Sequence, residues 1–123
     1  MTQQKGTIGL IGVGLIGSAL AERLIDGGFA VLGWDLYPNC LLNLSRLGGL
    51  AAPDAATVFR RCDPVFLSLP SHHEVKQVLE DCDAHLRPGS TIIDTTTGDP
   101  ISTEKIAEKL AARNLGYLDA TIS

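Results

Sequence analysis

The sequence is poor in the features that mark several classes of protein. It has three cysteines, Cys40, Cys62 and Cys82, and none of them forms a C-x-x-C pair. An odd number of widely spaced cysteines argues against a disulfide framework and supplies no cluster of metal ligands. We therefore expect reduced cysteines, a cytoplasmic protein and no metal site.

Long apolar runs and clustered basic residues are also missing. No stretch approaches the roughly 18 consecutive apolar residues that a membrane-spanning helix needs. Ten Lys and Arg residues stand against 14 Asp and Glu, which gives a net charge of −4, and the basic residues are scattered. This balance predicts a soluble chain that binds neither nucleic acid nor an anionic membrane. An anionic cofactor remains compatible, because backbone N–H groups at a helix end can hold phosphates.

A secretory signal is an alternative interpretation of the first residues. Lys5 precedes an apolar run over 8–20 that contains small residues. Five glycines from Gly6 to Gly17 argue against the helical core of a signal, and a helical pattern continues past residue 20 without a clear cleavage site. We therefore favour a folded N-terminal segment.

The most informative feature of the sequence is a glycine-rich turn. Gly12, Gly14 and Gly17 form a G-x-G-x-x-G pattern directly after the strand-like run 7–11. The first glycine of such a turn permits a tight bend, and the second lets the backbone approach a pyrophosphate. The third lets the following helix pack close to the sheet. The pattern predicts a dinucleotide-binding turn.

The helix that follows and an acidic residue complete the pattern. Leu15 and Ile16 lie in the first turn of a helix expected over 15–26, whose free N–H groups and dipole suit a pyrophosphate. Asp35 follows Gly17 by 18 residues and ends the second expected strand. Its carboxylate can accept hydrogen bonds from both hydroxyls of an adenosine ribose and would repel a 2′-phosphate. No arginine comes directly after it, so we favour NAD over NADP; an exposed turn aspartate is the alternative.

Strand and helix signals alternate along the whole chain. The expected helices cover 15–26, 37–47, 53–61, 71–86 and 99–114, and the expected strands cover 7–11, 29–34, 50–52, 64–69, 90–94 and 116–119. This alternation predicts an α/β fold with a doubly wound parallel sheet of about six strands. We interpret 1–123 as one dinucleotide-binding domain. Because ligands bind outside the C-terminal ends of such strands, we interpret the chain as cut off at its ligand edge and expect a further domain beyond it.

No set of residues in the sequence makes a complete catalytic centre. His72 and His73 follow the fourth expected strand, but neighbouring helical residues point about 100° apart, so at most one faces the cleft. Activated nucleophiles and paired carboxylates are missing, and we assign no catalytic residue. The loop 94–97 faces the same cleft; its threonines either hold the cofactor or cap the next helix.

Taken together, the motifs resemble the N-terminal cofactor domain of the β-hydroxyacid dehydrogenases, a family that includes 3-hydroxyisobutyrate and 6-phosphogluconate dehydrogenases. The segments that carry the likeness are 8–17, Trp34-Asp35, 67–70, 93–97 followed by Pro100, and 118–123. The last segment is similar to the family's D-A-P-V-S-G-G motif, with Thr121 in place of proline. Thr96 stands where the family has serine in I-D-x-S-T.

The resemblance implies functions for residues that spacing alone does not assign. Leu69, Pro70 and Thr97 would contact the nicotinamide half of NAD, and Ser123 would hold the substrate carboxylate. The family's catalytic lysine lies on a following helical domain. The resemblance therefore implies an NAD-dependent dehydrogenase that interconverts a small hydroxyacid and its semialdehyde or oxo acid, and that is a homo-oligomer at full length. An imine-reducing relative and a non-catalytic NAD-sensing scaffold are the alternatives.

Overall fold

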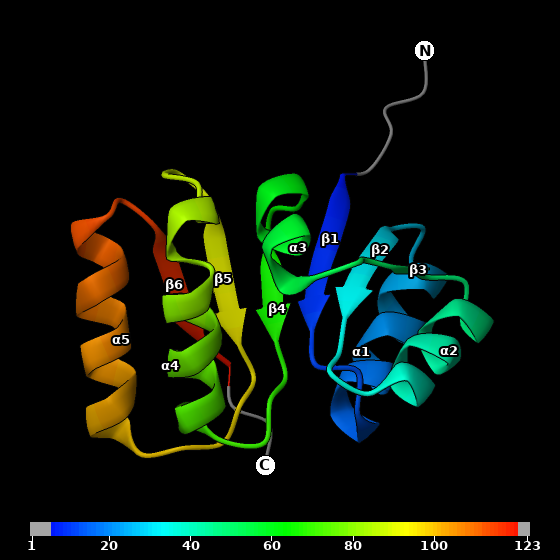
Figure 1. Ribbon diagram of the computed structural model, residues 1–123, viewed down its shortest axis with the longest axis horizontal. Coiled ribbons are helices and arrows are strands. Elements are labelled where there is room, and N and C mark those ends of the chain that lie inside the picture. Colours follow the sequence, from blue (N-terminus) through cyan, green and yellow to red (C-terminus); the bar gives the residue numbers. More distant parts are fainter. Residues whose placement is uncertain (1–5, 121–123) are drawn as a thin grey trace.

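The six strands form one parallel sheet in the order β3-β2-β1-β4-β5-β6 in the computed structural model, which describes residues 6–120 (Figure 1). The strands are β1 (Thr7–Ile11), β2 (Ala30–Trp34), β3 (Leu50–Ala51), β4 (Val65–Leu67), β5 (Thr91–Asp94) and β6 (Gly116–Asp119). The helices are α1 (Leu15–Asp26), α2 (Pro38–Arg46), α3 (Ala55–Arg61), α4 (His72–Asp81) and α5 (Pro100–Ala112), with a short 3₁₀ turn η1 (Asp83–His85). The expected fold class is confirmed.

Three helices begin at the side-chain caps that the sequence supplies. Asp54 accepts a hydrogen bond from the Thr57 N–H, and Asp99 accepts one from the Ser102 N–H. Ser71 caps α4 by accepting a hydrogen bond from the His73 N–H, and its hydroxyl donates to the Glu74 carboxylate. These caps satisfy N–H groups that a helix cannot pair internally.

The helix expected over 71–86 is shorter than the sequence predicts. α4 ends at Asp81, and the chain continues through η1. Arg113, which follows α5, donates to the main-chain oxygen of Asp83 at 2.8 Å and also pairs with its carboxylate. This tertiary contact takes up a carbonyl at the point where the regular helix would otherwise continue.

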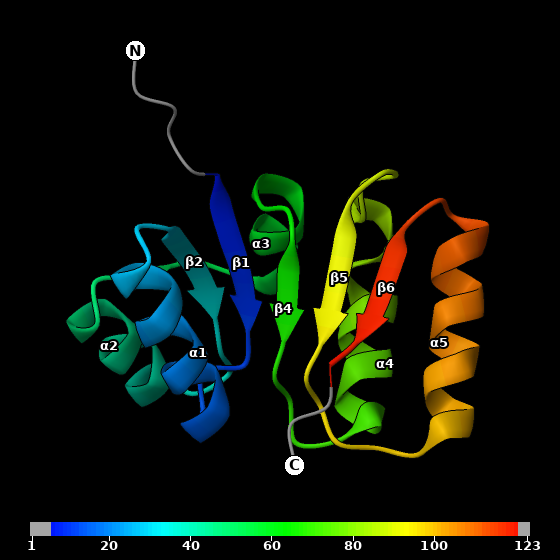
Figure 2. The same ribbon diagram turned by 180° about the vertical axis from the view of Figure 1, so that it is seen from behind.

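The two faces of the sheet are covered by different helices. α3, α4 and α5 cover one face (Figure 1), and α1 and α2 cover the other (Figure 2). The first face holds the larger core, to which Val58, Leu67 and Ile92 contribute fully buried side chains. The second holds a smaller core around Leu10 and Leu44.

Part of the second face has no helix over it. In Figure 2, α1 and α2 lie beside β1 to β3, and no described helix lies in front of β5 and β6. Phe66, Ile93 and Leu118 occupy matching register positions on β4, β5 and β6. Leu118 is 57% exposed. We call this set the apolar row.

The topology brings the predicted site residues to one edge. The strands are parallel, so the segments after β1, β2, β4 and β5 all leave the sheet at its C-terminal end. The strand order reverses between β1 and β4, which is where open α/β sheets bind ligands. Within residues 6–120, no helix is both long and apolar enough to cross a bilayer.

Candidate dinucleotide site

Two glycines of the turn after β1 are required by the backbone itself. Gly12 has φ +96°, and a Cβ there would lie 2.0 Å from the carbonyl oxygen of Ser68. A Cβ at Gly17 would lie 2.0 Å from the carbonyl oxygen of Gly12. Only glycine allows β1, the start of α1 and the loop after β4 to approach so closely.

Gly14 is different, because nothing fills the space beside it. Among residues 6–120, no atom beyond Gly14 and its chain neighbours lies within 4 Å of the position that a Cβ would take, and its φ of −80° suits any residue. Gly14 is also the N-cap of α1, and no side chain caps this helix end. Leu15 is 91% exposed and Ile16 is 39% exposed. The first N–H groups of α1 thus face an open cradle of the kind that holds a pyrophosphate.

Asp35 lies directly beside this turn. Its Oδ2 accepts a hydrogen bond from the Val13 N–H at 2.7 Å, and its Oδ1 accepts one from the Tyr37 N–H at 2.9 Å. The Gly12 N–H donates to the carbonyl oxygen of Trp34 at 3.0 Å, which joins the same two segments. Each carboxylate oxygen keeps a lone pair, so Asp35 can still accept from a ribose.

Sequence reasoning missed the contacts that support this half of the site. The Ser18 hydroxyl donates to the carbonyl oxygen of Val13 at 3.2 Å, and the Asn43 amide donates to the Ser18 hydroxyl at 3.1 Å. These bonds tie α1 and α2 to the glycine turn. On α2, burial and the nearby Asp35 carboxylate raise the pKa of the Cys40 thiol. No sequence pattern marks the hydrogen bond between Ser18 and Asn43, which lie 25 residues apart.

The loops after β4 and β5 are joined to each other. The Leu69 N–H donates to the Thr96 hydroxyl at 3.1 Å, and the Thr95 hydroxyl donates to the carbonyl oxygen of Leu67 at 2.8 Å. Thr96 is buried, whereas Pro70 and Thr97 are exposed at the edge. Asp99, and not a threonine of the loop 94–97, caps α5. The alternative interpretation of these threonines as caps of that helix is therefore wrong.

A buried polar cluster lies behind these loops. Asp94, which is fully buried, accepts from the Thr96 N–H at 2.8 Å and from the Tyr117 hydroxyl at 2.6 Å. Nε2 of His72 lies 3.7 Å from Oδ2 of Asp94. Burial, together with the hydrogen bond to Asp94, raises the pKa of Tyr117. His72 is 6% exposed, whereas its neighbour His73 is exposed.

Some predicted features lie outside this geometry. Ser123 and Thr121 are outside the described residues. Between residues 6 and 120, no group of three or more His, Cys, Asp or Glu side chains is arranged to hold a metal ion. All three cysteines are free thiols.

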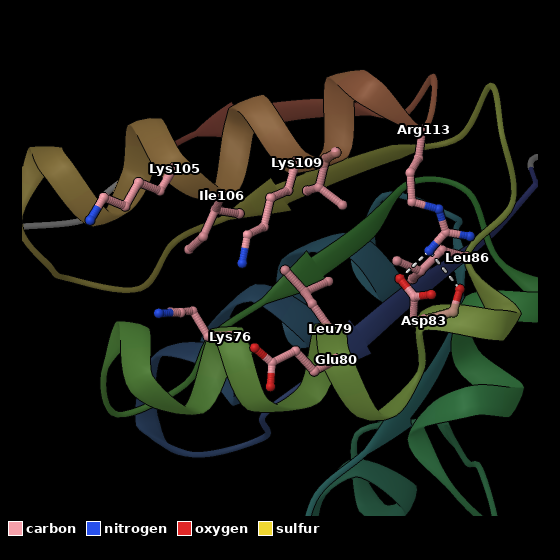
Figure 3. Close-up of a pocket in the computed structure, with 10 residues that line it drawn as sticks. Lys76, Leu79, Glu80, Asp83, Leu86, Lys105, Ile106, Lys109 and Arg113 are labelled. Carbon is pink, nitrogen blue, oxygen red and sulfur yellow. Dashed lines mark hydrogen bonds and ion pairs between the residues drawn. The ribbon is translucent and has the colours of Figure 1, made fainter.

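A separate hollow of about 110 Å³ lies between α4 and α5 (Figure 3). Leu79 and Ile106 form part of its apolar floor, and Lys76, Lys105 and Lys109 stand around it. None of the predicted cofactor residues lines this hollow. The candidate site is therefore the C-terminal edge of the sheet and not the hollow between α4 and α5.

Comparison with known families shows which family this domain belongs to. A family model described as the NAD binding domain of 6-phosphogluconate dehydrogenase matches residues 7–123. The chain belongs to this family of NAD-binding domains, as the resemblance predicted.

Individual relatives are dehydrogenases. The chain is 32% identical over 119 residues to L-threonate dehydrogenase of Cupriavidus necator, covering 94% of this chain and 40% of the relative. It is 31% identical over 119 residues to NAD-dependent L-serine dehydrogenase of Pseudomonas aeruginosa, with the same coverage. The chain thus spans about 40% of the length of these curated relatives.

Solved structures show the same architecture. The chain superposes on 3-hydroxyisobutyrate dehydrogenase from Salmonella typhimurium with a TM-score of 0.89 and 30% identity, over 97% of this chain and 42% of that one. It also superposes on an imine reductase from Pseudomonas sp. with a TM-score of 0.85 and 25% identity, over 92% of this chain and 40% of that one.

Proposed function

We propose that this chain is the cofactor-binding domain of an NAD-dependent dehydrogenase that interconverts a small hydroxyacid and its semialdehyde or oxo acid. The observation that carries the proposal is the Asp35 carboxylate held at the end of β2 by the Val13 N–H, beside the uncapped start of α1 and the open space at Gly14. Two relatives are named as dehydrogenases of L-threonate and of L-serine, which both carry hydroxyl groups. These names support the proposed substrate class.

Each predicted residue has a proposed part in binding the cofactor. The backbone at Gly12, Gly14 and Gly17, with the N–H groups of Leu15 and Ile16, would hold the pyrophosphate. Asp35 would accept hydrogen bonds from the adenosine ribose and repel the 2′-phosphate of NADP, so NAD is preferred. Leu69, Pro70 and Thr97 would border the nicotinamide half. Pro70 and Thr97 are exposed at that edge, which supports this assignment.

The bound NAD would supply the hydride acceptor. The chain's own residues would orient the cofactor and shield one side of the site, but none of them is placed to accept the hydroxyl proton. We propose that this proton goes to a lysine in a helical domain that follows residue 123, and that Ser123 helps to hold the substrate carboxylate. The greater length of the relatives supports the presence of a further domain. We also propose a cytoplasmic homo-oligomer that binds neither nucleic acid nor membranes; the three free thiols support the compartment.

The experiment that tests cofactor binding is a titration of the chain with NADH and, separately, with NADPH. The single tryptophan, Trp34, adjoins Asp35 and reports binding by fluorescence quenching. We expect saturable binding with a strong preference for NADH. Equal affinity, or a preference for NADPH, would contradict the proposed role of Asp35. Binding of neither nucleotide would contradict the proposed cofactor site.

An imine reductase is the second candidate, because one solved structure of that class shares the architecture. Turnover assays of the full-length protein with hydroxyacids and with cyclic imines separate the two activities. NADH binding without turnover of either would favour the non-catalytic scaffold.

A further inference from the structure

We propose that His72 is a positioning residue for the nicotinamide-side loops, and that its protonation strengthens cofactor binding by pairing with Asp94. The inference rests on the proposed NAD site. It concerns the buried cluster behind that site, whose histidine neither the glycine turn nor the hydride chemistry explains.

The first argument is that His72 is buried without a hydrogen bond. Among the residues that the structure describes, neither ring nitrogen has a hydrogen-bond partner. Leaving a buried polar group unpaired costs stability, so natural structures rarely keep one without a reason. Nε2 lies 3.7 Å from Oδ2 of Asp94, which is just beyond a hydrogen bond.

The second argument is that the backbone makes room for this ring. A Cβ on Gly98 would lie 2.2 Å from Nδ1 of His72 and 2.5 Å from Cγ. The loop after β5 therefore runs directly over the imidazole and can do so only with glycine at this point. His72 and Gly98 fit together as a pair, one from the start of α4 and one from the neighbouring loop.

Three titratable groups on neighbouring elements belong to the surroundings of the ring. Asp94 on β5 lies 3.7 Å from it, Tyr117 on β6 is hydrogen-bonded to Asp94, and Asp99 at the start of α5 interacts electrostatically with His72. On α4 itself, Glu74 is hydrogen-bonded to Ser71, and His73 is exposed. Of these groups, the Asp94 carboxylate is the acceptor close enough to pair with Nε2 when that nitrogen carries a proton.

The link to the cofactor runs through Thr96. Asp94 accepts the Thr96 N–H, and the Thr96 hydroxyl accepts the Leu69 N–H. A protonated His72 that donates from Nε2 to Asp94 would join the start of α4 to this chain of bonds. That contact would fix Leu69 and Thr97 relative to each other, which is what a cofactor lying across both loops requires.

The test compares NADH affinity between pH 6.0 and pH 8.5 in the wild type, His72→Gln and His73→Gln. Glutamine keeps a neutral donor but cannot gain charge, and His73 is the exposed neighbour on the same helix turn. Histidines titrate in this range. We expect wild type and His73→Gln to lose affinity by about fivefold or more as the pH rises, a typical size for coupling between sites. We expect His72→Gln to show a flat profile.

A flat wild-type profile, or a His72→Gln profile parallel to the wild type, would overturn the inference. A second readout needs no cofactor: an imidazolium bonded to Asp94 gives a slowly exchanging ring N–H proton signal at pH 6.0. That signal should be present in wild type and His73→Gln and missing in His72→Gln, and its absence from the wild type would overturn the pairing. Failure of the wild type to bind NADH at any pH would count against the proposed function, and the ring signal would then decide the pairing by itself.

Discussion

The carboxylate of Asp35 accepts the backbone N–H of Val13 at 2.7 Å across 22 residues of sequence. This bond places the residue proposed to choose between NAD and NADP directly against the turn proposed to hold the pyrophosphate. The two halves of the adenosine site are therefore one structural unit. The predictions below separate what this unit does for stability from what it does for binding.

Gly12→Ala should destabilise the fold strongly. The methyl group would meet the Ser68 carbonyl at a backbone with φ +96°, so the β1 and β4 loops would have to separate. We expect a loss of more than about 2 kcal/mol in the free energy of unfolding, measured by urea denaturation. Gly14→Ala is the control and should change stability by less than about 1 kcal/mol, because its space is open. Equal losses would show that the close approach at Gly12 is unimportant.

Gly14→Val should weaken cofactor binding without unfolding the chain. The side chain would occupy the empty cradle in front of α1, where the pyrophosphate is proposed to lie. We expect NADH affinity to fall by more than about tenfold, or about 1.4 kcal/mol. Gly6→Val is the matched control, since Gly6 also has open space at its Cβ position among the described residues and lies directly before β1. Unchanged affinity in Gly14→Val would place the phosphates elsewhere.

The double variant Asp35→Asn with Leu36→Arg should prefer NADPH. Asparagine keeps an oxygen for the Val13 N–H but removes the charge that repels a 2′-phosphate, and Leu36 is exposed at the same corner. We expect the dissociation constant for NADH, divided by that for NADPH, to rise by more than about tenfold. Asp35→Asn alone should give an intermediate ratio. A ratio that stays at the wild-type value in both variants would contradict the assignment of Asp35.

Tyr117 should make the fold sensitive to alkali. Burial and the hydrogen bond to Asp94 raise the pKa of Tyr117 well above its ordinary value of 10.0. The unfolded chain would release this proton more readily, so the stability due to the neutral hydroxyl is complete below pH 10 and is lost as the pH rises above it. Tyr117→Phe should be less stable at pH 8 but should lose less additional stability between pH 9 and pH 11. Urea midpoints across that range measure the difference, and parallel curves would contradict it.

The sequence predicts the architecture well because each signal for it is local. Alternating apolar runs, the caps at Asp54, Ser71 and Asp99, and the glycine turn each act within a few residues. The end of α4 is the main difference, since it depends on Arg113, which lies 30 residues beyond Asp83. Propensity within a helix cannot report such a tertiary contact.

The site is predictable only in its outline. Motif spacing brings Gly12 and Asp35 to one edge, but it does not reveal the bond from Val13 to Asp35. The cluster behind the loops is even less accessible to sequence reasoning, because His72, Asp94 and Tyr117 meet from three separate elements. Sequence reasoning about the two histidines allows one of them to face inward, and the burial of His72 against Gly98 shows which one it is.

We expect the apolar row across β4, β5 and β6 to affect how this chain behaves at high concentration. Phe66, Ile93 and Leu118 line up across the strands with no described helix over β5 and β6, while the molecule as a whole carries a net charge of −4. Charge repulsion keeps copies apart at low ionic strength, and salt screens that repulsion. Added salt should therefore cause copies of the chain to associate through the apolar row. The apparent molecular mass in solution should then rise with the salt concentration of the buffer.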